Sequence, residues 1–278
     1  MGGDGIKMKK TVKKLLFAVL VLIIIVPILF PLYFVLISSF KNMAQVYIMP
    51  PKLFGFQPIL DNYIYIFKTQ HYGTYMINST IVAVASTGLS LLLGVPAAYV
   101  IARYKMRAAS TAILTARLLP NISILLPYYF IFSKLQMIDT YGVLIISHMV
   151  LSMPLIVWIM VGFFEDIPIE LEEAAIVDGC SRQRCFTDVI LPICAPGLVT
   201  CSTLSFLGSW NNFQFALILS GEKTRTLPVS LQYFVSGADI RWGRMLAATI
   251  VVIVPTIILT MILQKYIVQG MTAGAVKG

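Results

Sequence analysis

The chain has 278 residues, of which 58% are hydrophobic and only 12% are charged, and its mean hydropathy is +0.87. Soluble domains are about half apolar and about a quarter charged, so this composition excludes a soluble globular domain, a disordered segment and a secreted disulfide scaffold. The net charge of +9 is more typical of the loops of a membrane protein than of a nucleic-acid-binding domain. We therefore predict an all-α integral membrane protein.

Six apolar stretches are long enough to cross roughly 30 Å of hydrocarbon as helices. Each contains proline, which removes a helical hydrogen bond and bends a helix, although membrane helices also tolerate it without a functional reason. The stretches divide the chain into a first helix over 15–40, a loop over 41–74 and a five-helix core over 75–268. They cover residues 15–40, 75–102, 110–133, 142–164, 193–219 and 245–268.

The distribution of Lys and Arg predicts which side of the membrane each loop faces. Twelve of them lie on the side of the N-terminus, and eight lie on the opposite side. Because cytoplasmic loops carry the excess of Lys and Arg, we expect both termini, residues 1–14 and 269–278, in the cytoplasm. Arg117 is left within the third stretch, near its cytoplasmic end, from where its long side chain can reach the interface.

The six stretches contain no Asp or Glu, and His148 is their only histidine. Proton-driven transporters commonly keep carboxylates or histidines in the membrane, and a lone histidine is more typical of hydrogen-bonded packing than of a proton relay. The chain also lacks the Gly-x-x-x-x-Gly-Lys-Ser/Thr phosphate loop. If this protein moves a solute uphill, a separate subunit must supply the energy.

The sequence carries no catalytic motif. There is no Gly-x-Ser-x-Gly turn and no His-Glu-x-x-His pair, so we expect no enzyme activity, no metal site and no cofactor in this chain. The four cysteines lack a Cys-x-x-Cys spacing and lie toward the reducing cytoplasm, so we expect free thiols. They are Cys180, Cys185, Cys194 and Cys201.

Residues 165–192 form an acidic segment that holds seven of the protein's twelve Asp and Glu. Pro168 suits a first helical turn, the glutamates after it favour the positive end of the helix dipole, and Gly179 suits the left-handed position that ends a helix. Ser181 can begin a second helix that leads to the fifth stretch. By composition alone, an ordinary solvated amphipathic loop is an alternative.

The order of residues in this segment resembles the signature loop of ABC importer permeases. Glu173-Ala174-Ala175 is followed after three residues by Gly179, and after nine more by Val189-Ile190-Leu191-Pro192. In that family the loop forms a coupling helix that docks in a cleft of the cytoplasmic ATPase, and the C-terminal tail reaches the ATPase interface. The residues that the resemblance implies as ATPase contacts are Glu173, Ala174, Ala175, Asp178, Gly179, Lys277 and Gly278.

Other segments resemble the carbohydrate branch of these permeases, specifically the subunit similar to the G component of the maltose importer. They are Asp61-Asn62-Tyr63 with Phe67, the run from Phe206 to Phe213, Leu227-Pro228-Val229 and the chain end from Gly270 to Gly278. The resemblance implies six transmembrane helices with a type I importer-like permease core. It also implies a multi-pass subunit of a bacterial or archaeal cell membrane that carries a sugar or oligosaccharide by alternating access.

The same resemblance implies the partners. They are a second permease subunit in a heterodimer, two ATPase subunits that hold ATP and Mg²⁺, an extracellular solute-binding protein that faces residues 220–244, the lipid bilayer and the carbohydrate itself, with no nucleic acid. Two alternatives stay open. One is an ABC permease for another uncharged solute, and the other is an ion-coupled secondary transporter that works without an ATPase.

A polar stripe in the fifth stretch is a candidate translocation path. Its residues recur at offsets of three, four and three, so on a helix they share one face. Lipid would penalise this face, which should therefore meet a partner helix or a watery cavity. Neighbouring Trp210 and Phe213 suit uncharged, hydroxyl-rich ligands, whereas serines in membrane helices also simply join helices. The stripe consists of Ser202, Ser205, Ser209 and Asn212.

Overall fold

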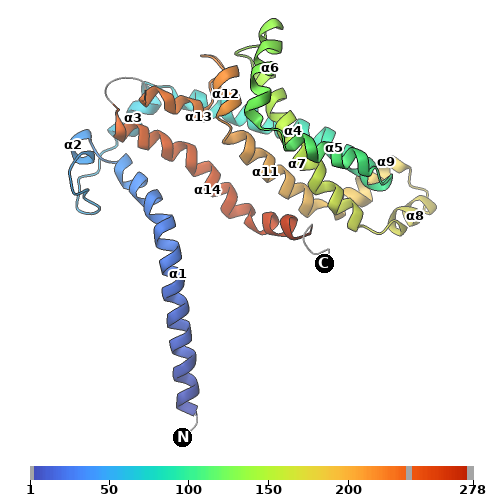
Figure 1. The fold of residues 1–278 in the computed structure, drawn as a ribbon, viewed down its shortest axis with the longest axis horizontal. Coiled ribbons are helices and arrows are strands. Elements are labelled where there is room, and N and C mark those ends of the chain that lie inside the picture. The colour runs from blue at the N-terminus through green and yellow to red at the C-terminus, as the bar shows by residue number, and fades with distance from the viewer. Residues whose placement is uncertain (1–2, 236–239, 274–278) are drawn as a thin grey trace. The chain divides into compact units, whose positions relative to one another are not determined.

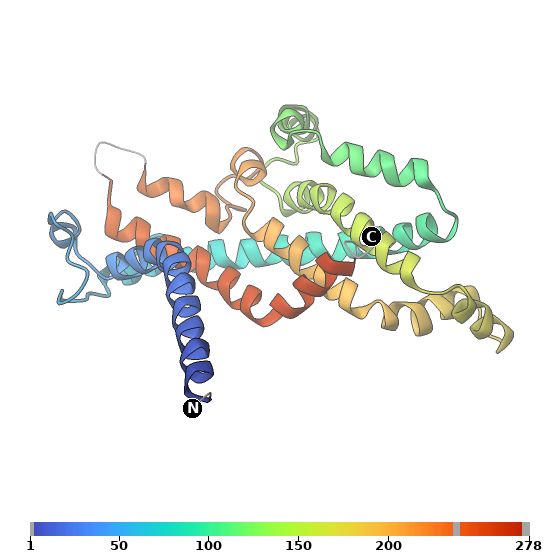
Figure 2. The same ribbon diagram turned by 60° about the horizontal axis from the view of Figure 1, so that its bottom comes forward.

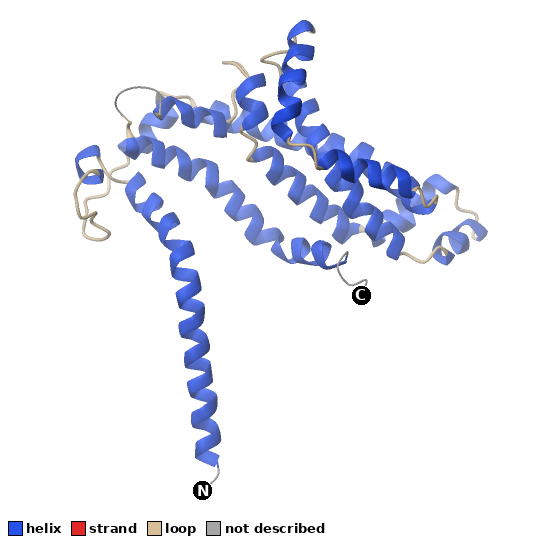
Figure 3. Cartoon of the chain, in the orientation of Figure 1, coloured by secondary structure: helices blue, strands red, loops and turns tan. Residues whose placement is uncertain are grey.

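The computed structural model describes residues 3–235 and 240–273, and every regular element in these ranges is a helix (Figure 3). The all-α prediction is therefore confirmed. The long helices are α1 (Gly3–Ser39), α4 (Tyr72–Arg103), α5 (Arg107–Arg117), α6 (Asn121–Lys134), α7 (Tyr141–Asp166), α11 (Ala195–Trp210) and α14 (Trp242–Ala273). The short ones are α2 (Met43–Val46), α3 (Asp61–Lys68), α8 (Glu170–Val177), α9 (Arg182–Arg184), η1 (Cys185–Ile190), α10 (Leu191–Ile193), α12 (Gln214–Leu219), α13 (Leu227–Ser230) and η2 (Leu231–Phe234).

Within the described part of the chain, four helices are long and apolar enough to cross a membrane on their own, and there are up to six spans if each of two bent helix pairs counts as one. The four single spans are α1, α4, α7 and α14, which agree with the first, second, fourth and sixth predicted stretches. Each continues as one helix through its internal prolines, so proline does not break these four helices. These prolines are Pro27, Pro31, Pro96, Pro154 and Pro255.

The third stretch is not one helix over 110–133, as the sequence predicted. It consists of α5 and α6, whose axes differ by 89° across a short break. Pro120 lies at this break with ψ 126°, outside the helical region. Because the ring of proline crowds the residue before it and proline has no N–H to donate, the helix ends here and a new one begins.

The fifth stretch also differs from the predicted single helix over 193–219. The helix α11 ends at Trp210, and α12 begins only at Gln214. On its other side, residues 182–193 and α11 form a second bent pair with an angle of 77°. The longest unbroken helix of this stretch, α11, has 16 residues, which is short for a membrane-spanning helix.

The chain divides into two compact units, each described by itself. The first unit comprises residues 1–70 and 231–251. In it the buried amide of Asn62, on α3, donates to the carbonyl oxygens of Ser39 and Lys41 at 2.9 and 2.8 Å, just beyond α1. A Cβ atom on Gly243, in α14, would lie 2.8 Å from the same amide, so only glycine fits there. Asn62 thus fixes α3 against the end of α1 and the start of α14.

The second unit comprises residues 71–230 and 252–278, and its centre is the packing of α4, α7 and α11, which lie side by side in Figures 1 and 2. Small side chains on α4 allow this close approach, because they let helix backbones come together without a cavity. At Gly94 a Cβ atom would already lie 3.1 Å from Cγ2 of Ile156 on α7. Other small residues buried along α4 are Ser79, Ala83, Ser86, Ser90, Ala98 and Ala102.

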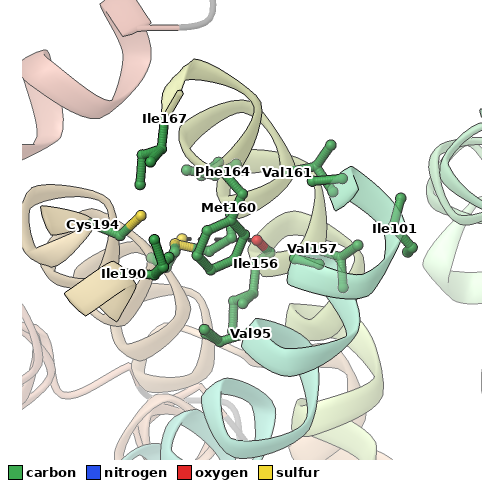
Figure 4. Close-up of a cluster of buried hydrophobic side chains, with 14 of the residues drawn as sticks. Val95, Ile101, Ile156, Val157, Met160, Val161, Phe164, Ile167, Ile190 and Cys194 are labelled. Carbon is green, nitrogen blue, oxygen red and sulfur yellow. Dashed lines mark hydrogen bonds between the residues drawn. The ribbon is translucent and has the colours of Figure 1, made fainter. Parts of the chain in front are cut away.

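A buried apolar cluster lies between the last turns of α4 and α7 and the elements η1 to α11. Figure 4 shows Met160 and Phe164 from α7 beside Ile190 and Cys194, with Val95 from α4 below Ile156 and Ile101 at the far edge of the cluster. Ala175 of α8 packs against this cluster as a half-buried side chain. The cluster therefore provides the fixed base on which the acidic segment 165–192 rests.

Candidate functional site

The helix α8 ends where the sequence predicted, but it begins at Glu170, so Pro168 lies before the helix and not in its first turn. Three glutamates occupy the first turn, where the helix dipole favours negative charge. Gly179 has φ +90°, and its amide donates to the carbonyl oxygen of Ile176, while the amide of Cys180 donates to Ala175, both at 3.0 Å. This pair of bonds is the Schellman arrangement, which stops a helix sharply.

One side of α8 is exposed. Glu173, Ala174, Asp178 and Gly179 lie at the surface, and no atom lies within 4 Å of a Cβ placed on Gly179. Apolar side chains flank them, with Val177 85% exposed. The exposed surface is thus acidic and of low bulk at Ala174, and it gives another protein close access to the helix.

Two of the residues singled out on α8 differ in position. Ala174 is exposed, whereas Ala175 is half-buried against the apolar cluster. Of the residues that the resemblance implies as ATPase contacts on α8, Ala174 is therefore at the surface and Ala175 is turned toward the interior. In the structure, Ala175 attaches α8 to its own chain.

Glu172, the buried residue of α8, is a functional candidate that no sequence pattern indicated. Its carboxylate pairs with Nε of Arg103, the last residue of α4, and accepts a hydrogen bond of 2.7 Å from the hydroxyl of Tyr99. Arg103 comes 69 residues earlier in the chain. No local pattern could indicate this contact, because helical spacing relates only residues three or four apart.

The predicted second helix after Gly179 is also present, in three pieces. The hydroxyl of Ser181 accepts a hydrogen bond of 3.4 Å from the amide of Arg184, and α9 begins there. A π-helical turn, η1, follows and leads through α10 to α11. Cys180, Cys185, Cys194 and Cys201 are all free thiols, as expected.

The four residues of the polar stripe do not stay together in the structure: three lie on α11, and one lies in the break after it. Ser205 and Ser209 are buried, and the hydroxyl of half-buried Ser202 donates to the carbonyl oxygen of Leu198 in its own helix at 2.6 Å. Asn212 lies beyond the end of α11, and its side-chain oxygen accepts a hydrogen bond of 3.1 Å from Phe215 of α12. The four residues therefore do not share one face of one helix.

A buried polar cluster joins three helices through Ser209. Its hydroxyl lies 2.7 Å from Nδ1 of His148, on α7, and accepts a hydrogen bond of 3.0 Å from Ser86, on α4. His148 is 1% exposed, which agrees with the packing role expected of a lone histidine. Nε2 of His148 and the hydroxyl of Ser205 are buried, and neither has a hydrogen-bond partner among the described residues.

The two aromatic residues beside the stripe have different surroundings. Trp210 is 4% exposed, stacks on Phe206 with ring centroids 5.8 Å apart, and donates from Nε1 to the carbonyl oxygen of Val252 at 3.2 Å. Its ring is therefore committed to packing within the chain. Phe213, in the break between α11 and α12, is 39% exposed.

A second polar cluster fixes the loop between α12 and α13. The carboxylate of Asp139 accepts hydrogen bonds from the amides of Gly221, Lys223 and Thr224 and from the Thr224 hydroxyl, at 2.8 to 3.2 Å. Burial alone would raise the pKa of Asp139, but the Thr224 hydroxyl and the three amides hold that pKa below its usual value. On the other side of the loop, the amide of Asn78 donates to the carbonyl oxygens of Lys223 and Arg225.

The remaining predictions concern a metal site, Arg117 and the C-terminal tail. No group of three or more metal-ligating side chains occurs among the described residues. Arg117 ends α5 as an exposed side chain beside the 89° bend. Lys277 and Gly278 lie outside the described residues.

Residues 90–273 match the protein family described as "Binding-protein-dependent transport system inner membrane component". The matched segment runs from the middle of α4 to the end of α14. It therefore includes α8, the apolar cluster against which Ala175 packs, and both Ser209 and His148 of the polar cluster.

Relatives with similar sequences extend over nearly the whole chain. The chain is 36% identical to the sulfoquinovosyl glycerol transport system permease protein SmoH of Agrobacterium fabrum, over 90% of this chain and 89% of that protein. It is 32% identical to the trehalose/maltose transport system permease protein MalG of Thermococcus litoralis, over 97% and 99% of the two chains.

Among solved structures, a chain of a bacterial ABC transporter involved in the import of the acidic polysaccharide alginate has a similar fold. The TM-score is 0.79 with 21% sequence identity, covering 93% of this chain and 97% of the other. At this identity the likeness concerns the fold.

Proposed function

Since the chain belongs to the family of binding-protein-dependent transport system inner membrane components, we propose that it is the membrane subunit of an ATP-driven importer that translocates a sugar or oligosaccharide. The family consists of permease subunits without catalytic activity of their own. The chain fits this role, because its sequence has apolar spans and contains no phosphate-binding loop.

The observation that carries the coupling part of the proposal is the exposed surface of α8. Glu173, Ala174, Asp178 and Gly179 form its acidic and narrow part, and Ala175 attaches the helix to the apolar cluster. A rigid helix on a packed base can transmit a push from a docked protein, whereas a loose loop would absorb it. We propose that the protein docked on α8 is an ATPase, and that the tail residues Lys277 and Gly278 reach the same interface.

The partners follow from this role. We place α8 and both termini in the cytoplasm, where two ATPase subunits bind ATP with Mg²⁺. A second permease subunit completes the membrane part, and the loop between α12 and α13 faces a solute-binding protein on the opposite side. The exposed apolar side chains along α1, with Phe17 70% and Ile23 64% exposed, are suited to lipid.

The proposed substrate class rests on the relatives and on the chemistry of the spans. Two of the relatives are named for sulfoquinovosyl glycerol and for trehalose and maltose, which are all glycosides. The apolar helices predicted from the sequence contain no Asp or Glu that could balance a cationic solute. Hydroxyl and amide groups at Ser202, Ser205, Ser209 and Asn212 remain the candidate polar contacts near the path, in addition to the packing bonds that Ser209 makes with His148 and Ser86.

Transport then works by alternating access. Closure of the ATPase pair moves α8, and the membrane helices turn their cavity toward the loaded binding protein. ATP hydrolysis resets the cavity to face the cytoplasm. The docked ATPase can shift this equilibrium only by contacts that differ between the two states, because equal binding to both would change nothing.

Substitution of Ala174 tests the docking. Ala174→Trp adds a large ring at the centre of the exposed face, and it should abolish ATP hydrolysis stimulated by the loaded binding protein while the chain still inserts into the membrane. Ala174→Ser is the matched control, because it changes the same position by one small hydroxyl and should keep the stimulation. Normal stimulation in the tryptophan variant would refute the docking assignment.

A further inference from the structure

The coupling helix has a single buried charge, and its partner lies on a membrane helix. Glu172 is 8% exposed as a residue, whereas Glu170 and Glu173 on the same helix are exposed. One carboxylate oxygen pairs with Nε of Arg103, and the other accepts a hydrogen bond of 2.7 Å from the hydroxyl of Tyr99. Both partners belong to the last turns of α4.

Arg103 extends the contact to a third element. Its Nη1 donates to the carbonyl oxygens of Phe164 at 2.7 Å and Ile167 at 3.3 Å, at the C-terminal end of α7. A cation at this end of a helix is favoured by the helix dipole as well as by the hydrogen bonds. One guanidinium group therefore joins the ends of α4 and α7 to the first turn of α8.

Aromatic packing fixes this group in place. The ring of Tyr99 lies edge-on to Phe164, with centroids 5.5 Å apart, and 4.8 Å from the ring of Phe186 in η1. The two charged side chains are only 12% and 10% exposed. An ion pair shielded from water to this extent is held strongly, because separating the two charges would leave each without a partner in a poorly solvated site.

Arg103 has one hydrogen-bond donor that no described residue uses in this position of α8. Its Nη2 is buried and has no hydrogen-bond partner among the described residues. A buried donor without a partner costs free energy, so a position of α8 that gave this nitrogen an acceptor would be favoured. A second position of α8 could therefore give Arg103 a different set of partners while the ion pair is kept.

Resting on the proposed function, we infer that Glu172 and Arg103 are the positioning residues that carry the movement of α8 to the membrane helices α4 and α7. Other links also join α8 to the rest of the chain, namely the backbone on each side of it, the weak hydrogen bond from the Cys185 thiol to the carbonyl oxygen of Glu172, and the packing of Ala175 on the apolar cluster. Apolar packing lets α8 slide against the cluster without a large loss of contact. The ion pair has directed bonds that resist such sliding, so a shift of α8 is passed on to α4 and α7.

The test compares Glu172→Gln with Glu170→Gln in the assembled complex of this chain with its second permease and ATPase. Hydrogen exchange is measured over 99–106 and over 170–177, with and without the nucleotide analogue AMP-PNP and Mg²⁺. In the parent complex the analogue should change exchange in both segments. Glu170→Gln is the matched control, because it removes the same charge from an exposed site on the same helix and should behave as the parent.

With Glu172→Gln, the nucleotide-dependent change over 99–106 should fall by about tenfold or more, a typical size for coupling between sites, while the change over 170–177 persists. An undiminished response over 99–106 would overturn the inference. If Glu172→Gln fails to assemble, Arg103→Lys decides, since it keeps the positive charge but cannot bond Glu172 and the carbonyl oxygens of α7 at once: a reduced response over 99–106 supports the inference and an unchanged one overturns it. Failure of the parent chain to bind an ATPase would instead refute the proposed function.

Discussion

Asp139 accepts a hydrogen bond of 2.8 Å from the amide of Gly221, and a Cβ atom at position 221 would lie 2.6 Å from the same carboxylate. The carboxylate of Asp139 lies so close to position 221 that only glycine fits there. The amide of Gly221 in turn uses this carboxylate as its hydrogen-bond acceptor. Through this contact the chain holds the 221–226 loop, which we propose faces the binding protein, in one conformation.

We predict that Asp139→Ala loosens this loop. Three amides and the Thr224 hydroxyl would lose their acceptor, at a cost of about 1–3 kcal/mol. Trypsin should then cleave after Lys223 or Arg225 several times faster in the variant than in the parent. Glu222→Gln is the control, because Glu222 is exposed in the same loop and its replacement should leave the cleavage rate unchanged.

The same carboxylate predicts a pH dependence. The pKa of Asp139 is lower in the folded protein than in the unfolded chain, where an Asp has a pKa of about 3.9. Its contribution to loop stability is therefore complete above this unfolded value and is lost as the pH falls through the lowered folded value. Amide protection at Gly221 and Thr224, measured by hydrogen exchange, should be constant from pH 5 to 7. A loss of protection within that range would contradict the assignment.

Gly197 provides a test of the packing between α7 and α11. A Cβ atom there would lie 2.7 Å from Cδ2 of Phe163, so Gly197→Ala should destabilise the folded chain by about 1–3 kcal/mol through overpacking. In Gly208→Ala, on the same helix, the added methyl group meets no atom of the described chain, and the substitution should be neutral or stabilising. Thermal unfolding midpoints in detergent give the comparison, and equal midpoints for the two variants would show that α7 and α11 do not pack as described.

Substitutions of Ser209 and Ser202 distinguish a role in helix packing from a role along the solute path. Ser209→Ala removes the partner of His148 Nδ1, so it should lower stability by roughly 0.6–2 kcal/mol, as measured for hydrogen bonds between membrane helices. Ser202→Ala should be nearly neutral, because that hydroxyl bonds only within its own helix. A Ser209 variant as stable as the parent would contradict the packing role, and a changed range of transported sugars would support the proposed contact with the path.

Local signals in the sequence predict α8 well. The glutamates after Pro168, Gly179 and Ser181 act on their immediate neighbours, and the structure places an acidic first turn, a left-handed end and a second helix start at these positions. The exposed and buried sides of α8 were less accessible from sequence. Ala174 and Ala175 look alike in the chain, and only the apolar cluster below α8 distinguishes them.

Features that depend on distant contacts could not be predicted. Apolar length alone made 110–133 and 193–219 single helices, yet Pro120 and the segment 211–213 separate each into parts. The pairing of Glu172 with Arg103 joins residues far apart in the chain and leaves no periodic trace. Glu172 differs from the exposed Glu170 and Glu173 only because its side of α8 is buried against the rest of the chain.

Reconstitution into lipid vesicles tests the central claim most directly. The chain is compared alone and together with its second permease and ATPase, with ATP on the side that α8 faces and the loaded binding protein on the other. We predict uphill uptake only in the complete complex with ATP, and none by the chain alone under a proton or sodium gradient. Uphill uptake by the isolated chain under such a gradient would contradict the account.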